Sequence, residues 1–282
     1  MTPGAAADTT TGPSGSPSQL LGAGLVCGSA VALFGLEQRL LGYALLLLGL
    51  LVAWSIGRGG DGRLVRHLSL IATSLVIISL IPLKADLSDG AIARFAVVLS
   101  LAVLVPLVLS RGVWSEDVIR FPVRTGRPWS RFEWGYLALV VVLGYLVLPV
   151  YFIGSGAYLN WPAISTPGEV ARLFGGVNAV GLWDELFFIC TVFALLRQHF
   201  SLAQANLLQA TVFVSFLWEL GYQSWGPLLT VPFALLQGYI FQRTKSFLYV
   251  LVVHLTFDVI IFGVIVHAHN PGWLDVFLTA PR

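Results

Sequence analysis

The chain has 282 residues, of which 57% are hydrophobic and 11% are charged, and its mean hydropathy is +0.84. This composition excludes an ordinary soluble domain and predicts a protein that crosses a membrane several times. The net charge of +2 is too small and too scattered for a nucleic-acid surface, so we expect no nucleic-acid partner. Cys27 and Cys190 both fall inside apolar stretches, which indicates neither a disulfide framework nor a zinc site.

The apolar stretches are about 20 residues long, the length of a helix that spans a bilayer, rather than the alternating segments of about 10 residues typical of a barrel. We therefore predict an all-α, polytopic transmembrane bundle of eight or nine spans. Residues 1–18, rich in Gly, Pro, Ser and Thr, are expected to be a disordered tail. The expected helices lie at about residues 20–36, 40–56, 68–83, 95–110, 135–153, 181–197, 202–220, 227–242 and 246–266.

The basic residues indicate how these helices are oriented. With nine spans, 11 of the 16 Lys and Arg residues fall in the second, fourth, sixth and eighth connections. Cytoplasmic loops carry the excess of Lys and Arg, so the N-terminus is expected in the cytoplasm and the C-terminus outside. On this topology the polar residues of the last helices open toward the outer half of the membrane.

Ionisable residues are concentrated in the last four expected helices, which carry Asp184, Glu185, Glu219, His254 and Asp258, whereas we expect none in the first five. An acid at a bilayer centre costs about 3 kcal/mol, so such residues indicate a functional site. His254 and Asp258 are four residues apart and share a helix face. Asp184 and Glu185 are about 100° apart around their helix, so we expect only one of them to point fully into a shared cavity.

Each of these residues also has a structural interpretation. Glu219 stands at a helix end, where its carboxylate could simply be solvated at the membrane interface. His254 with Asp258, and the pair Asp184 and Glu185, could form hydrogen bonds that stabilise helix packing. The sequence leaves these alternatives open.

The order of the polar residues resembles the CPBP family, the CAAX-prenyl-protease and bacteriocin-processing membrane proteins. An acidic pair on one helix is followed by a helix ending in a polar residue, and then by the segment 238–258, which contains an Arg-Thr pair. That segment ends in an H-x-x-x-N/D pattern, here His254 and Asp258. The resemblance covers roughly residues 170–262.

The other two family motifs are altered in this chain. In the first, E-E-x-x-x-R, Asp184 and Glu185 match the acids, and Ile189 replaces the Arg. In the second, F-x-x-x-H, we place Glu219 at the His position, with Phe213 or Phe216 near the aromatic one.

The resemblance implies a glutamic-type intramembrane protease without a cofactor. By position, Asp184 and Glu219 would activate water, while His254 and Asp258 would help hold the oxyanion. Because Glu219 cannot act as an imidazolium, we expect Asp184 or Glu185 to share a proton with it, as in aspartic proteases. His254 would then stabilise the oxyanion, oriented by Asp258. A divalent metal held by these residues is a second solution, although the usual zinc-ligand spacing is absent.

The resemblance further implies a membrane-anchored or lipid-modified protein substrate, cut near its hydrophobic segment. An outward-opening site would suit removal of a C-terminal anchor or sorting of exported proteins, in a bacterial plasma membrane. One alternative is a non-catalytic relative, for example a bacteriocin immunity or membrane binding protein; another is a proton-coupled transporter. The expected division is a tail at residues 1–18, a transmembrane scaffold at 19–168, a CPBP-like protease core at 169–266 and a C-terminal tail at 267–282.

Overall fold

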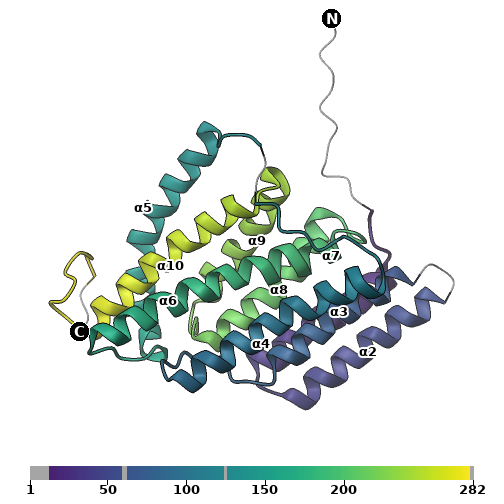
Figure 1. The fold of residues 1–282 in the computed structure, drawn as a ribbon, viewed down its shortest axis with the longest axis horizontal. Coiled ribbons are helices and arrows are strands. Elements are labelled where there is room, and N and C mark those ends of the chain that lie inside the picture. Colours follow the sequence, from purple (N-terminus) through teal and green to yellow (C-terminus); the bar gives the residue numbers. More distant parts are fainter. Residues whose placement is uncertain (1–12, 59–61, 124–125, 280–282) are drawn as a thin grey trace, which may run out of the picture.

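The computed structural model describes residues 13–58, 62–123 and 126–279, and these residues form helices without any strand. Most of the helices lie side by side in one slanted bundle, while α5 diverges from it at one edge (Figure 1). The helices are α1 (Pro17–Ala30), α2 (Arg39–Gly57), α3 (Arg63–Ile78), α4 (Asp89–Val108), α5 (Arg131–Gly154), α6 (Pro167–Asp184), α7 (Ala194–Leu196), α8 (Leu202–Leu220), α9 (Pro227–Thr244) and α10 (Phe247–His269). Three π-helical segments, η1 (Val31–Gly35), η2 (Leu109–Val113) and η4 (Glu185–Phe193), and one 3-10 turn, η3 (Ala157–Asn160), complete the order.

Four helices start with the same local signal, a capping box. Ser16, Ser130, Thr166 and Ser201 each accept a hydrogen bond from the backbone N–H three residues later, whose Gln or Glu side chain returns one to the cap. The boxes satisfy N–H groups that have no partner within the helix, which is costly to leave undone near a membrane. These short sequence patterns therefore set the starts of α1, α5, α6 and α8.

Six helices among the described residues are long and apolar enough to cross a membrane. The helices α3, α8 and α9 occupy expected positions but do not meet that standard: α3 has only 16 residues, and α8 and α9 carry several amide and hydroxyl side chains. The expected count of eight or nine spans is thus not confirmed. The six are Pro17–Gly35, Arg39–Gly57, Asp89–Val113, Arg131–Gly154, Pro167–Leu196 and Phe247–His269.

The segments α6, η4 and α7 join into one rod, Pro167–Leu196, which lies at the centre of the bundle. It packs against α4, α8, α9 and α10 and is the most deeply buried of the six candidate spans. A helix that is apolar on all sides is expected in such a buried position. The expected helix at 181–197 is therefore only the second half of a longer rod, whose start is set by the Thr166 capping box.

A π-helical segment begins at Glu185, directly after Asp184. Its wider turn is marked by the Thr191 hydroxyl, which donates to the carbonyl of Leu186, five residues earlier. Such segments occur often at functional sites, because they rotate the side chains that follow them relative to a regular α-helix.

The expectation that the first five helices lack ionisable residues is wrong, because three of them start earlier than expected. Helix α3 starts at Arg63 and so includes His67, while α4 starts at Asp89, and α5 at Arg131, which brings Glu133 into its first turn. Charged residues at helix ends remain within reach of the interface, so they do not carry the cost of a charge at mid-membrane.

His67 is part of a buried polar cluster that joins three connections at one end of the bundle. Its Nε2 lies 2.6 Å from Glu116 Oε2, and its Nδ1 lies 2.9 Å from His199 Nε2. Burial raises the pKa of Glu116, but hydrogen bonds with His67 and Arg66 outweigh burial and leave that pKa below its ordinary value. We call this end of the bundle, which carries Arg66, Glu116 and His199, the arginine end.

Candidate active site

Four of the five expected site residues meet in the middle of the bundle. His254 Nδ1 lies 2.7 Å from Glu185 Oε1, and His254 Nε2 lies 3.6 Å from Asp184 Oδ2 and 3.9 Å from Asp258 Oδ1. All four side chains are buried, with exposed fractions of 5% or less. Asp184 and Glu185 come from the central rod, and His254 and Asp258 from one face of α10 that packs against it. The i, i+4 spacing therefore placed the second pair correctly.

A cavity of about 490 Å³ lies next to this cluster, and the two adjacent acids relate to it differently. Asp184, His254 and Asp258 line the cavity, together with Tyr222, whereas Glu185 does not. Glu185 instead lies behind His254 and accepts the hydrogen bond of the ring nitrogen that faces away from the cavity. The expectation that one of the two acids faces the cavity agrees with this geometry, and Asp184 is that acid.

Gln237 on α9 completes the support for Glu185, and the sequence analysis missed it. Its side-chain Nε2 donates to Glu185 Oε1 at 2.6 Å and to the carbonyl of Val250 at 3.1 Å, and the side chain is fully buried. Both partners are acceptors, which assigns the amide orientation without ambiguity. Oε1 of Glu185 thus accepts from both Gln237 and His254, so these contacts hold the His254 ring in one position.

Aromatic rings enclose the other faces of His254. The ring of Phe233 contacts it edge-on, with centroids 5.0 Å apart, and the ring of Phe213 lies 6.0 Å away. These buried rings exclude water around the histidine, so the polar contacts act in a medium of low dielectric constant.

Two carboxylate oxygens of the cluster have no hydrogen-bond partner among the described residues, Oδ1 of Asp184 and Oδ2 of Asp258. A buried acceptor without a partner is unfavourable by about 1–3 kcal/mol. Both residues line the cavity, so a water molecule or a substrate group there could satisfy these oxygens.

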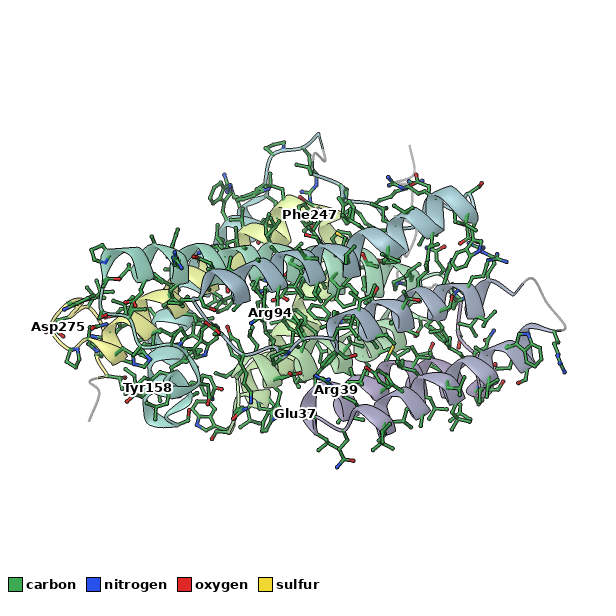
Figure 2. The ribbon with its side chains drawn as sticks, turned by 60° about the horizontal axis from the view of Figure 1, so that its bottom comes forward. Glu37, Arg39, Arg94, Tyr158, Phe247 and Asp275 are labelled. Carbon is green, nitrogen blue, oxygen red and sulfur yellow. The ribbon has the colours of Figure 1, made fainter. Side chains whose placement is uncertain are left out.

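The structure does not bring Glu219 to this cluster. Its Oε1 accepts a hydrogen bond from the backbone N–H of Leu83 at 3.0 Å, and it lines a second cavity of about 250 Å³ with Glu37 and Arg39. Figure 2 shows Glu37 and Arg39 close together, next to the first helices of the chain. The sharing of a proton between Glu219 and Asp184 or Glu185 is therefore not supported by the geometry.

The spacing of the second family motif explains this placement. Counting four residues from Phe213, whose ring faces His254, leads to Leu217, which lines the active-site cavity. Glu219 lies two residues further along α8, about 200° around the helix, and therefore on another face. An apolar side chain thus stands where the motif has its His.

We expect Glu219 to be a structural residue. Glu219→Gln keeps an oxygen that can accept from Leu83 and should preserve both the melting temperature and hydrolysis of a protein substrate. Glu219→Ala leaves the N–H of Leu83 without a partner and should lower the free energy of unfolding by about 1–3 kcal/mol, with hydrolysis retained. Thermal unfolding in detergent and a cleavage assay test both variants; lost hydrolysis in a stable Glu219→Gln protein would return Glu219 to the catalytic site.

The remaining candidates of the sequence analysis are placed as follows. Cys190 is buried in η4, with no basic side chain in hydrogen-bond contact, as expected for a packing residue. Among the described residues, no group of three or more His, Cys, Asp or Glu side chains is arranged to hold a metal ion.

Comparison with known families gives a match for the segment that builds this site. Residues 166–260 match the family described as Type II CAAX prenyl endopeptidase Rce1-like. The match begins at the capping residue of α6 and ends just after Asp258, and so spans the acidic pair, Gln237 and the His254 face of α10. This chain belongs to the CPBP family.

Membership of the CPBP family identifies the chain as a protein of the CAAX-type intramembrane protease kind, a hydrolase with a membrane-associated or prenylated protein as its substrate. With its apolar helices, it is an integral membrane protein. Neither the curated proteins nor the solved structures give a match. The CPBP assignment therefore depends on this segment alone, while residues 13–165 form scaffold helices outside the matched region.

Proposed function

We propose that the chain is an intramembrane endopeptidase in which Asp184 activates the hydrolytic water. One observation carries this proposal: Asp184, His254 and Asp258 line the same buried, mostly apolar cavity, and two of their carboxylate oxygens lack a protein partner. A carboxylate that faces such a cavity is the usual position for a general base.

The reaction would proceed in two steps. Asp184 accepts a proton from water as the water oxygen attacks the carbonyl carbon of the peptide bond. The protonated ring of His254, held at Nδ1 by Glu185, donates from Nε2 to the resulting oxyanion. When the intermediate collapses, Asp184 returns its proton to the leaving amine, and the carbon–nitrogen bond breaks. Asp258, on the other side of Nε2, orients the ring as the acid of a triad does.

The walls of the cavity support a substrate that comes from the membrane. The cavity lies between α4 and α6, which contact each other at few residues. Ile92 and Leu104 on α4 and Leu182 on α6 line it and are also exposed on the outside of the bundle, at 41%, 50% and 39%. Apolar side chains exposed at the opening would lie against lipid tails, so a hydrophobic protein segment could enter sideways between α4 and α6.

The position of the opening supports a site on the outer side of the membrane. Residues from the connections opposite the arginine end, Ala85 to Leu87, Trp161 and Tyr222, line the cavity. Because Lys and Arg mark the cytoplasmic side, the cavity would open away from the cytoplasm. We therefore propose that the protein processes exported, membrane-anchored proteins, for example by removing a C-terminal anchor, in a bacterial plasma membrane.

A survey of protein termini by mass spectrometry tests this proposal. Membrane and secreted fractions are compared between cells with the intact gene, cells without it, and cells that carry Asp184→Asn with Glu185→Gln. We expect the same set of proteins to keep their hydrophobic anchors in the deletion strain and in the double variant. If the double variant processes its targets like the intact protein, hydrolysis by these acids is wrong.

The altered motifs favour one alternative, a CPBP relative that binds hydrophobic segments without cutting them. Ile189 is buried in place of the motif Arg, and Leu217 occupies the place of the first motif His. This alternative predicts that the deletion has a phenotype which the double variant lacks, so the same survey separates the two functions.

A further inference from the structure

Arg172 marks the outer end of the active-site cavity. It lies on α6, twelve residues before Asp184, and it is the one Lys or Arg among the described residues that line the cavity. A helix rises about 1.5 Å per residue, so Arg172 and Asp184 are separated by about 18 Å along the helix axis. The cavity thus has a cationic group at its mouth and the acid and histidine cluster at its inner end.

The contacts of Arg172 leave most of its guanidinium available. Only Nη1 is bonded in the described part of the chain: it donates to the carbonyl of Leu87 at 2.9 Å and pairs with Asp89 Oδ1 at 2.7 Å. The side chains of Arg172 and Asp89 are 46% and 87% exposed, and ion pairs this exposed are weak. The remaining N–H groups on Nε and Nη2 form the planar fork that binds a carboxylate through two hydrogen bonds.

We infer that Arg172 binds a carboxylate of the substrate and so sets the distance from that group to the bond that is cut. The inference rests on the proposed protease function. An extended chain covers about 3.3 Å per residue, so about 18 Å corresponds to five or six residues. The carboxylate would be either the C-terminus of the substrate or an Asp or Glu side chain at the same distance.

Asp86, the other charged residue at the mouth, does not compete for this role. Its Oδ1 accepts the backbone N–H of Ser88, so it is engaged in the turn before α4. As an acceptor it would repel a carboxylate, which makes Arg172 the group that decides whether an anion can approach.

The experiment maps cleavage sites in peptides of alternating Leu and Ala, incubated with the purified protein in detergent micelles. Three forms of each peptide are compared: a free C-terminus, a C-terminal amide, and an amide that carries one internal Asp. With the intact protein we expect cleavage about five residues from the carboxylate, at a site that shifts when the carboxylate is moved. If the free-acid form alone is positioned in this way, the carboxylate is the C-terminus; if the Asp form behaves alike, a side chain serves equally.

The Arg172→Gln variant should lose this positioning. We expect kcat/KM for the carboxylate peptides to fall about tenfold or more, and kcat/KM for the plain amide to stay near the intact value. Arg94→Gln is the matched control, because Arg94 is an exposed arginine on α4 that does not line the cavity. Equal losses for acid and amide peptides, or cleavage sites that do not follow the carboxylate, would overturn the inference.

A binding measurement separates this inference from the proposed function. Fluorescence anisotropy of the labelled peptides reports affinity whether or not they are cut. Tighter binding of the carboxylate forms, lost in Arg172→Gln, supports the role of Arg172 even if no peptide is hydrolysed, in which case the protease proposal alone fails. Equal binding of acid and amide forms counts against Arg172.

Discussion

Asp184→Asn is expected to lower the rate of peptide hydrolysis by about 10²- to 10⁴-fold, the range that a general base contributes. The amide has nearly the same shape but does not accept a proton from water. Since Asp184 lines the cavity and Glu185 does not, Glu185→Gln should slow hydrolysis less, by disturbing the position of His254. Initial rates with one purified substrate, measured for each variant at several pH values, compare the two effects.

The stability of the Asp184→Asn protein should not fall. Oδ1 of Asp184 is buried without a partner, and a buried charge that is not fully paired is unfavourable, so a neutral amide is tolerated at least as well. We expect the melting temperature in detergent to stay the same or rise. Asp117→Asn, which changes an exposed acid at the arginine end, is the matched control and should keep full activity. An Asp184→Asn protein that hydrolyses at the normal rate would exclude this residue as the base.

Gly181→Ala is expected to disrupt the site by one methyl group. A Cβ at Gly181 would overlap Oδ2 of Asp258 and would lie 3.3 Å from Cδ2 of His254. Either the Asp258 carboxylate turns away or α6 and α10 move apart, and overpacking of this kind costs about 1–3 kcal/mol. Alanine is better than glycine in a helix by about 1 kcal/mol, which offsets part of that cost. We therefore expect a lower melting temperature and a large loss of hydrolysis.

Gly175→Ala on the same helix separates packing from helix propensity. A Cβ there meets no atom within 4 Å, and Gly175 does not line the cavity. It should stabilise the protein by about 0.4–1 kcal/mol with unchanged hydrolysis. If both alanine variants behave alike, the close approach of α6 to Asp258 does not matter for the reaction.

The helices could be predicted well where their signals are local. Helix α8 spans the expected residues, 202–220, because a Ser201 capping box starts it and Gly221, at a φ of 128°, ends it. Helix α3 was misplaced by five residues at each end. Its first turn contains His67, whose burial depends on Glu116, 49 residues away, and no local pattern reports such a partner.

The site residues divide in the same way. The i, i+4 spacing on one helix was enough to place His254 and Asp258 together. Gln237 escaped notice because it is uncharged, and its importance comes only from Glu185, 52 residues earlier. Glu219 attracted notice as an acid in an apolar helix, yet its partner is the backbone of Leu83 rather than the site.

The sequence by itself therefore determined the all-helical membrane architecture and the set of costly polar residues, because apolar length, capping and charge are properties of short segments. Only the tertiary structure decided that Asp184 faces the cavity, that Glu185 lies behind His254, and that Glu219 lies elsewhere. Those facts depend on how far one helix turns relative to its neighbours. The π-helical segment after Asp184 and the close crossing at Gly181 set that turn.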